Sequence, residues 1–261
     1  MLELVHMIIL ATLQGLTEFL PVSSSGHLVL TQHLLGTREG DIFFDIILHL
    51  GTLGSVLVVY RREIVRLLRF DSLSLRYILA LVVGTIPAVI VGLVFRDSIE
   101  SLFHSPVFAA GGLLLTAGFL FSTRYSTSDT AGLSEPWEPQ APDLSKALLI
   151  GCGQAFAILP GISRSGSTIA ASLWLRVPRA EAARFSFLLS IPAICGALVL
   201  QLSDGVAPGA NWTWMILSAL VAFGVGLLAL RWTALAVVQD HFWKFSVYCV
   251  VVGAVALVVL L

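Results

Sequence analysis

Two short polar stretches interrupt an otherwise apolar sequence and decide the fold: LPVSSSG at 20–26 and LPGISRSG at 159–166. Each lies in the middle of a longer apolar segment, 2–35 or 144–175, and contains the Pro, Gly and Ser residues that end helices. The apolar halves on either side have only ten to fifteen residues, too few to cross a bilayer. We therefore predict two re-entrant helix-turn-helix pairs.

The rest of the chain has the composition of a membrane protein. Of 261 residues, 57% are hydrophobic and 12% are charged, about half the charged share of an ordinary soluble domain. The mean hydropathy is +0.93, which excludes a soluble globular domain. We predict an all-α polytopic membrane protein with two re-entrant pairs and six transmembrane helices, at 43–60, 77–95, 106–123, 185–202, 213–230 and 244–261.

The two interruptions resemble copies of each other. A shift of 140 residues places Gln14 on Gln154, Ser23 on Ser163, Ser25 on Ser165 and Gly26 on Gly166. We predict a duplication, with a first repeat at 1–125, a cytoplasmic linker at 126–143 and a second repeat at 144–261. Each repeat has three spans after its broken pair, so the repeats have opposite topology. Inverted repeats with interrupted helices are common in transporters, where the site lies near the bilayer midplane.

The basic residues orient this topology. Twelve Lys and Arg residues fall on one side, in 61–76, 124–146, 176–184 and 231–244, whereas the other side has only Arg38 and Arg96. The positive-inside rule makes the first side cytoplasmic. Both termini then face outward, the first broken pair enters from outside, and the second enters from the cytoplasm. The net charge of −1 and the absence of an extended basic face exclude nucleic-acid binding.

Arg164 is the one basic residue within a motif at membrane depth. Such a charge is costly in the bilayer unless it lines a polar cavity and meets an anion. Pro160 and Gly161 end the preceding helix, and the following Ser residues begin a new one, so free backbone N–H groups gather beside the guanidinium. This combination suits a phosphate group. The structural alternative is an Arg that pairs with a carboxylate to pin two helices.

The first motif contributes complementary groups. Gln14 and Glu18 are four residues apart and share a helix face, and Ser24 and His27 are three apart at the start of the next helix. A carboxylate at this depth needs a partner. For Glu18 the candidates are Arg164, His27 or a bound divalent cation. We expect these groups to converge on one midplane cavity with Gln14 and Ser23 among its polar lining.

Two other residues have weaker claims to the site. His49 could line the cavity, although Asp45 four residues earlier makes a local hydrogen bond as plausible. Gln154 could reach the site as the counterpart of Gln14.

The motifs QGLTEFLPVSSSGH at 14–27 and PGISRSGST at 160–168 resemble those of the bacterial undecaprenyl-diphosphate phosphatase, or bacitracin-resistance, family. The resemblance covers both motifs, their separation, the chain length and the span pattern. It implies hydrolysis of undecaprenyl diphosphate to the monophosphate carrier of peptidoglycan synthesis, and resistance to bacitracin. It also implies a location in the bacterial cytoplasmic (inner) membrane, with the active site open to the periplasm.

The resemblance also implies roles for individual residues. The catalytic set is Glu18, Ser24, His27 and Arg164, and the phosphate-binding set is Ser163, Arg164, Ser165, Gly166 and Thr168. A divalent cation, Mg²⁺ or Ca²⁺, is expected at Glu18. Many family members have Glu where this chain has Gln14, so a two-carboxylate metal site becomes a one-carboxylate site here. The expected partners are the lipid substrate and membrane lipids, with a homodimer as one possible assembly.

Several mechanisms are compatible with these residues. We favour Ser24 as nucleophile with His27 as its base, while direct attack by His27, or by a water that His27 or Glu18 activates, stays open. A transporter or flippase for a lipid-linked phosphate is the rival function, because the inverted repeat is transporter architecture and fold alone does not determine function. A carrier would need only the anion-binding groups, without an acid, a base and a nucleophile.

Overall fold

The computed structural model describes residues 2–35, 42–128, 137–202 and 212–261, and all the regular secondary structure within these ranges is helical. Arg38 and residues 129–136 of the linker lie outside these ranges. The described α-helices are α1 (Leu2–Thr17), α2 (Ser24–Leu35), α3 (Ile42–Val59), α4 (Arg61–Leu67), α5 (Ser72–Val94), α6 (Arg96–Phe103), α7 (Pro106–Ser122), α8 (Leu144–Phe156), α9 (Arg164–Trp174), α10 (Arg179–Leu202), α11 (Trp212–Val238) and α12 (Phe245–Leu260).

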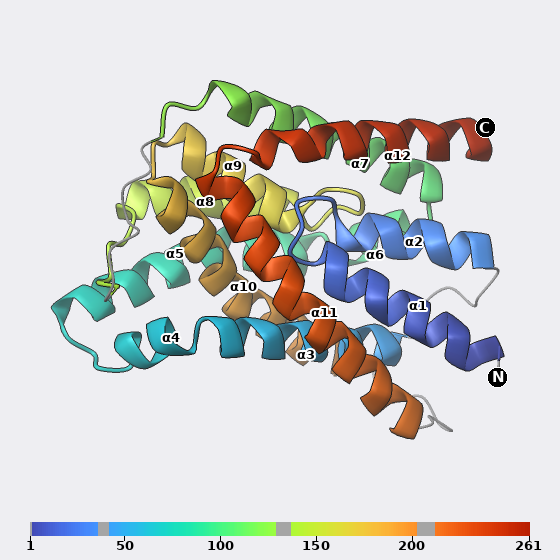
Figure 1. Ribbon diagram of the computed structural model, residues 1–261, viewed down its shortest axis with the longest axis horizontal. Helices are drawn as coiled ribbons and strands as arrows, with labels where there is room; N and C mark the ends of the chain where they lie inside the picture. The colour runs from blue at the N-terminus through green and yellow to red at the C-terminus, as the bar shows by residue number, and fades with distance from the viewer. Residues whose placement is uncertain (1, 36–41, 129–136, 203–211) are drawn as a thin grey trace.

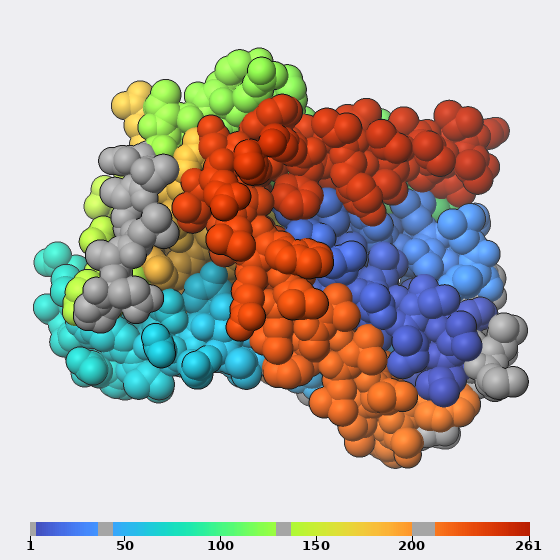
Figure 2. All heavy atoms as spheres, in the orientation of Figure 1, coloured from blue at the N-terminus to red at the C-terminus, as the bar shows by residue number. Residues whose placement is uncertain are grey.

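Both predicted helix-break-helix pairs are present. The first pair is α1 and α2, and the second is α8 and α9. In Figure 1 the two pairs enter the molecule from opposite ends, and their breaks meet in its interior. Both chain ends lie at the end from which the first pair enters, and α4 lies at the other end. In the space-filling view the blue atoms of α1 lie against the orange atoms of α11 (Figure 2).

The spans confirm an all-α polytopic fold. Five described helices are long and apolar enough to cross a membrane: α5, α7, α10, α11 and α12. The remaining predicted span, 43–60, corresponds to α3, which passes the same test together with α4, from which it is bent by 74° at Tyr60. Three helices are longer than predicted, because α5 begins at Ser72, α10 begins at Arg179 and α11 extends to Val238.

The two breaks have the same hydrogen-bonded turn. Ser23 Oγ accepts a hydrogen bond from the Gly26 amide at 3.2 Å, and Ser163 Oγ accepts one from the Gly166 amide at 3.0 Å. Each serine therefore satisfies one free N–H group of the following helix. The correspondence agrees with the offset between the motifs. The inverted repeat itself stays a prediction.

Hydroxyl groups from two spanning helices hold the breaks in place. Thr116 of α7 accepts a hydrogen bond from the Ser163 amide at 3.0 Å and donates one to the Gly161 carbonyl at 2.9 Å. Thr233 of α11 donates to the Phe19 carbonyl at 3.1 Å. Non-helical backbone at membrane depth is tolerated only where its polar groups find such partners. These bonds therefore position the motif residues.

A buried ionic cluster explains why α10 begins early. Glu181 accepts hydrogen bonds from Tyr77 at 2.5 Å, Arg184 at 2.8 Å and Trp137 at 3.2 Å. Arg184 also lies 3.6 Å from Glu63 of α4. The charged residues are neutralised by one another, so the helix continues through them. The cluster ties α4, α5 and α10 together at one end of the molecule.

A second charged group lies at the turn between α4 and α5. Asp71 caps α5 by accepting the Ser74 amide at 2.9 Å, and it pairs with Arg66 at 2.6 Å. The Ser74 amide, with Arg66, lowers the pKa of the Asp71 carboxyl below its ordinary value. Arg66 also reaches Glu138 at 2.8 Å. This turn is therefore fastened to the described part of the predicted linker.

Candidate active site

The Glu18 carboxylate joins the two motifs. Its Oε1 lies 2.5 Å from Arg164 Nη2, and its Oε2 accepts hydrogen bonds from Ser24 Oγ at 2.7 Å and Gln14 Nε2 at 3.0 Å. The Glu18 and Arg164 side chains are only 7% and 15% exposed. Of the predicted partners of Glu18, the structure selects Arg164. Gln14, Ser24 and Arg164 all meet at Glu18, where the sequence predicts His27 as well.

The site also gathers positive charge from backbone. Helix α2 begins at Ser24 and α9 begins at Arg164, so two helix N-termini face the region of Glu18. Such N-termini attract anions. Arg164 Nη1 is buried and has no hydrogen-bond partner among the described residues. The site therefore keeps a cationic donor beyond the one that Glu18 uses, and this donor suits a phosphate oxygen.

All three predicted phosphate-binding hydroxyls, on Ser163, Ser165 and Thr168, serve the fold instead. Ser163 Oγ caps α9, and Ser165 Oγ donates to the Leu20 carbonyl of the first break at 3.3 Å. Thr168 Oγ1 lies 2.6 Å from Ser186 Oγ on α10, within the protein core. These side chains hold the second break against the first break and α10. The Ser163 and Gly166 amides are already bonded, so the Arg164 and Ser165 amides at the start of α9 are the ones that can meet a phosphate.

His27 is turned away from Glu18. Its Nδ1 lies 2.8 Å from the Ser23 carbonyl, its Nε2 lies 2.8 Å from the Tyr248 hydroxyl, and the two rings are stacked at 9°. A carbonyl oxygen can only accept a hydrogen bond, so His27 Nδ1 carries the proton. The Nε2 atom of the neutral ring then accepts a hydrogen bond from the Tyr248 hydroxyl. Both nitrogens are engaged. Of the side chains predicted to share one site, Glu18, Ser24 and Arg164 therefore lie together, whereas His27 bonds to Tyr248.

A different histidine lies beside Glu18. His49 Nε2 is 3.9 Å from Glu18 Oε2, and its Nδ1 donates to the Asp45 carbonyl at 2.8 Å. The structure therefore shows both predicted possibilities for His49, the local hydrogen bond to Asp45 and a position beside the site. It is the residue whose place sequence reasoning undervalued. The signal in the sequence was the position of His49 within an apolar span. A polar ring at membrane depth is costly, so such a residue commonly marks a functional site.

Two other predicted lining residues have structural positions. Gln154 Nε2 donates to the Gly84 carbonyl of α5 at 3.5 Å, so it packs between helices and does not reach Glu18. Ser23 has a positive φ of 67° and forms the turn before α2. Its side chain is used in the cap of that helix.

The residues at Glu18 do not fit a resident divalent cation. Both carboxylate oxygens already accept hydrogen bonds, and the Arg164 guanidinium neutralises the charge that a cation would need. Gln14 contributes an amide where a second carboxylate would be required. Within the described ranges, no group of three or more His, Cys, Asp and Glu side chains could hold a metal ion.

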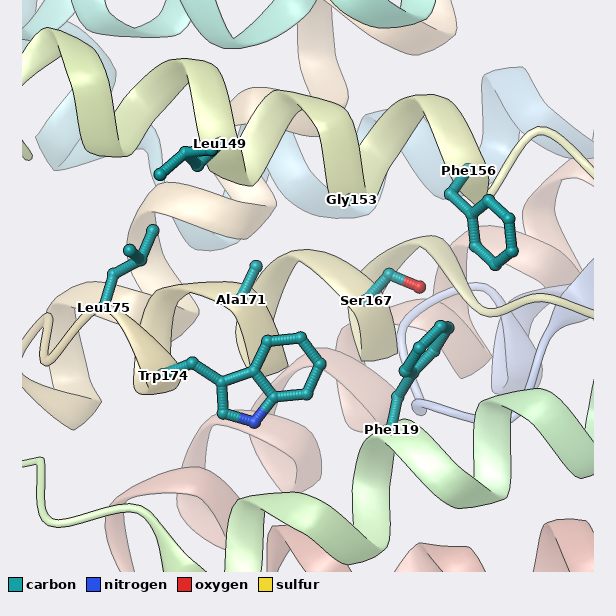
Figure 3. Close-up of a pocket in the computed structure, with 8 residues that line it drawn as sticks. All are labelled: Phe119, Leu149, Gly153, Phe156, Ser167, Ala171, Trp174 and Leu175. Carbon is teal, nitrogen blue, oxygen red and sulfur yellow. The ribbon is translucent and has the colours of Figure 1, made fainter.

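Two grooves open on the surface of the helix bundle near the breaks. The larger, about 500 Å³, lies between α7, α8 and α9 and is shown in Figure 3. Its lining residues are Phe119, Leu149, Gly153, Phe156, Ser167, Ala171, Trp174 and Leu175. The smaller, about 420 Å³, lies between the first break, α11 and α12, and includes Leu20, Ala236, His241, Lys244 and Tyr248. Both grooves are mainly apolar, as a lipid chain would require.

Comparisons with known proteins identify the family of this chain. The family model described as "Bacitracin resistance protein BacA" matches residues 7–255. The chain is 42% identical to an undecaprenyl-diphosphatase of Desulfatibacillum aliphaticivorans, over 97% of both chains. It is also 42% identical to an undecaprenyl-diphosphatase of Rhodopirellula baltica, over 100% of this chain and 99% of the relative. An undecaprenyl-diphosphatase of Korarchaeum cryptofilum is 37% identical over 97% of both chains.

Proposed function

This chain belongs to the BacA bacitracin-resistance family, and we propose that it hydrolyses undecaprenyl diphosphate to undecaprenyl phosphate and inorganic phosphate. This reaction returns the lipid carrier to peptidoglycan synthesis and confers resistance to bacitracin. The observation that carries the proposal is the contact of Glu18 with Arg164 on one oxygen and Ser24 on the other. It places a cation, a hydroxyl and a proton acceptor within one buried site.

Arg164 binds the terminal phosphate in this proposal. Nη2 stays with Glu18, which fixes the guanidinium plane, while the unpartnered Nη1 and the first amides of α9 meet the phosphate oxygens. Charge on those oxygens is largest in the transition state of phosphoryl transfer, so these donors lower the barrier.

Ser24 is the proposed nucleophile. Its hydroxyl already donates to Glu18 Oε2, so the proton has an acceptor as Oγ approaches phosphorus. The new Oγ–P bond forms as the bond to the bridging oxygen breaks, and that oxygen leaves with its electron pair on the lipid phosphate. Water then attacks the phosphoserine, Oγ leaves with its electron pair, and Ser24 regains a proton.

The two histidines take different parts. His49, 3.9 Å from Glu18 Oε2, can exchange a proton with the carboxyl group between the two steps. His27, which the sequence predicts as the base, is a positioning residue in this proposal. It fixes the Ser23 carbonyl and with it the turn from which Ser24 projects.

A divalent cation belongs to the proposal only as a companion of the diphosphate. Mg²⁺ prefers substrate phosphates and water to a closed protein cage. Because Glu18 is already neutralised by Arg164, we expect no tight binding of Mg²⁺ or Ca²⁺ to the protein without substrate.

The location follows from the same family membership. We propose the bacterial cytoplasmic membrane, with the site reached from the periplasm. The support is the excess of basic residues on one side of the predicted topology. A homodimer is a further prediction, which cross-linking of the purified protein in detergent tests.

The decisive experiment is release of inorganic phosphate from a C55 or C15 prenyl diphosphate by the purified protein. We expect turnover by the wild type and none by Arg164→Ala, with Arg124→Ala as a control that removes an exposed arginine in contact with the Trp243 ring. A transporter or flippase would release no phosphate from either substrate. That result would overturn the phosphatase proposal.

A further inference from the structure

The larger groove follows one face of α9. Arg164, Ser167, Ala171 and Trp174 are separated by three, four and three residues, which is the spacing of a single helical stripe. Arg164 begins the stripe at the active site, and the other three line the groove. Figure 3 shows Ser167 at one end, near Phe119 and Phe156, and Leu149 and Leu175 at the other. The groove therefore starts one helical turn from the proposed phosphate ligand.

Ser167 is the polar group at this end of the groove. Its residue is 5% exposed, and its Oγ has no hydrogen-bond partner among the described residues. In Figure 3 the hydroxyl points into the groove. A buried hydroxyl without a partner is unfavourable, so its position is explained by a ligand that supplies an acceptor. A hydrocarbon chain has no acceptor, whereas a phosphate at the head of such a chain does.

The remaining lining is apolar and largely aromatic. The Phe119 ring makes edge contacts with Phe156 at 5.9 Å and with Trp174 at 6.1 Å. The Trp174 indole is fixed by a hydrogen bond from Nε1 to Ser122 Oγ at 3.1 Å. These contacts give the groove defined walls. From Ser167 to Leu175 the helix rises about 12 Å, enough for the first few isoprenoid units.

We propose that this groove binds the first isoprenoid units of the polyprenyl diphosphate, with Ser167 donating to the lipid-side phosphate. The proposal rests on the proposed function. The terminal phosphate meets Arg164, the leaving phosphate lies one turn further along α9, and the chain continues past Ala171 to Trp174. In a bilayer, apolar contact gives little net affinity, because lipid chains are equally apolar. The groove therefore acts by orienting the bridging bond for in-line attack.

The test compares substrates of different chain length. Ala171→Phe fills the groove about two turns beyond Arg164, where a C15 chain lies and a C5 chain does not reach. We expect kcat/KM for farnesyl diphosphate to fall about tenfold and kcat/KM for isopentenyl diphosphate to stay unchanged. Trp174→Ala, at a half-exposed position that folding tolerates, should lower only the farnesyl value, by several-fold. The matched control is Ala236→Phe in the smaller groove, which should change neither.

Ser167→Ala tests binding of the phosphate separately from binding of the isoprenoid chain. Its proposed contact is with phosphate, so kcat/KM should fall about tenfold for both substrates. Ser172→Ala is the control on the same helix, because Ser172 already bonds to the Thr168 carbonyl at 2.8 Å.

The outcomes divide the two proposals. Equal losses on both substrates for Ala171→Phe and Trp174→Ala, or no loss on either, overturn the groove assignment while leaving the phosphatase intact. A farnesyl-specific loss in Ala236→Phe moves the chain to the smaller groove. A wild type that releases no phosphate from either substrate overturns the proposed function and this inference with it.

Discussion

Glu18 Oε1 lies 2.5 Å from Arg164 Nη2, although 146 residues separate them in the chain. Each residue belongs to a different broken pair, so the contact joins the two motifs within the interior of the bundle. A buried ion pair of this kind is retained for what it positions, because its desolvation cost offsets most of its attraction. Here it orients a guanidinium with one donor free and a carboxylate that accepts the Ser24 hydroxyl.

The first prediction concerns the planar shape of Arg164. Arg164→Lys keeps the charge but cannot contact Glu18 and a phosphate with two donors held in one plane. We expect turnover of a prenyl diphosphate to fall by about 10²–10³-fold, as when one fixed transition-state donor is removed. Phosphate release by purified variants measures this. Near wild-type turnover in Arg164→Ala would contradict the assignment.

The second prediction identifies the nucleophile. Ser24→Ala removes the hydroxyl that contacts Glu18, and we expect at least about a thousandfold loss of phosphate release. Ser25→Ala is the matched control, because Ser25 bonds to Ser23 and makes no contact with Glu18. Retention of a tenth or more of the activity in Ser24→Ala would favour attack by water instead.

A third prediction tests the orientation of the chain. The Glu100 and Glu138 side chains are 61% and 57% exposed and lie on opposite predicted sides of the membrane. With Cys152, Cys195 and Cys249 replaced by Ala, Glu100→Cys should react with an impermeant maleimide from the periplasm. Glu138→Cys should react only after the membrane is opened. Labelling of both from the same side would refute the inverted topology.

The buried cluster around Glu181 gives a prediction about stability. Tyr77→Phe removes the hydroxyl that donates a hydrogen bond to Glu181 at 2.5 Å. The buried Glu181 carboxylate is then left with fewer partners. We expect a loss of about 1–3 kcal/mol in the free energy of unfolding, seen as a lower melting temperature in detergent. Activity per folded molecule should stay at the wild-type level. Unchanged melting would show that Arg184 and Trp137 suffice.

Much of this site follows from sequence, because helix breaks within apolar segments can be recognised by composition alone. The breaks at 20–26 and 159–166 rest on that reasoning, whereas Arg164 is one of three partners that the sequence leaves open for Glu18. The placement of His27 does not. Residues three apart on a regular helix share a face, but the first turn of α2 follows a residue with positive φ, Ser23, and Tyr248 of α12 determines where the ring lies.

The second motif shows a different limit. Ser163, Ser165 and Thr168 are the residue types that bind phosphate, and they are also the types that cap helices and bond to backbone. Sequence cannot separate these uses, because the choice depends on which spans pack nearby. Thr168 meets Ser186 of α10, and Ser165 meets the Leu20 carbonyl.

The final prediction separates a positioning histidine from one that transfers a proton. His27→Ala should lower phosphate release by orders of magnitude, because it frees the Ser23 carbonyl and with it the turn that directs Ser24. Tyr248→Phe removes only the outer bond to Nε2, at 2.8 Å, and should cost about tenfold. In both variants the pH profile of kcat/KM should keep its shape, since the group that titrates lies elsewhere.

His49→Ala is the comparison for His27→Ala. If His49→Ala loses one limb of the pH profile and His27→Ala keeps both, proton exchange belongs to His49, the histidine beside Glu18. Loss of a limb in His27→Ala would instead require the ring to leave Tyr248 and enter the site during turnover, and the positioning role would have to be given up.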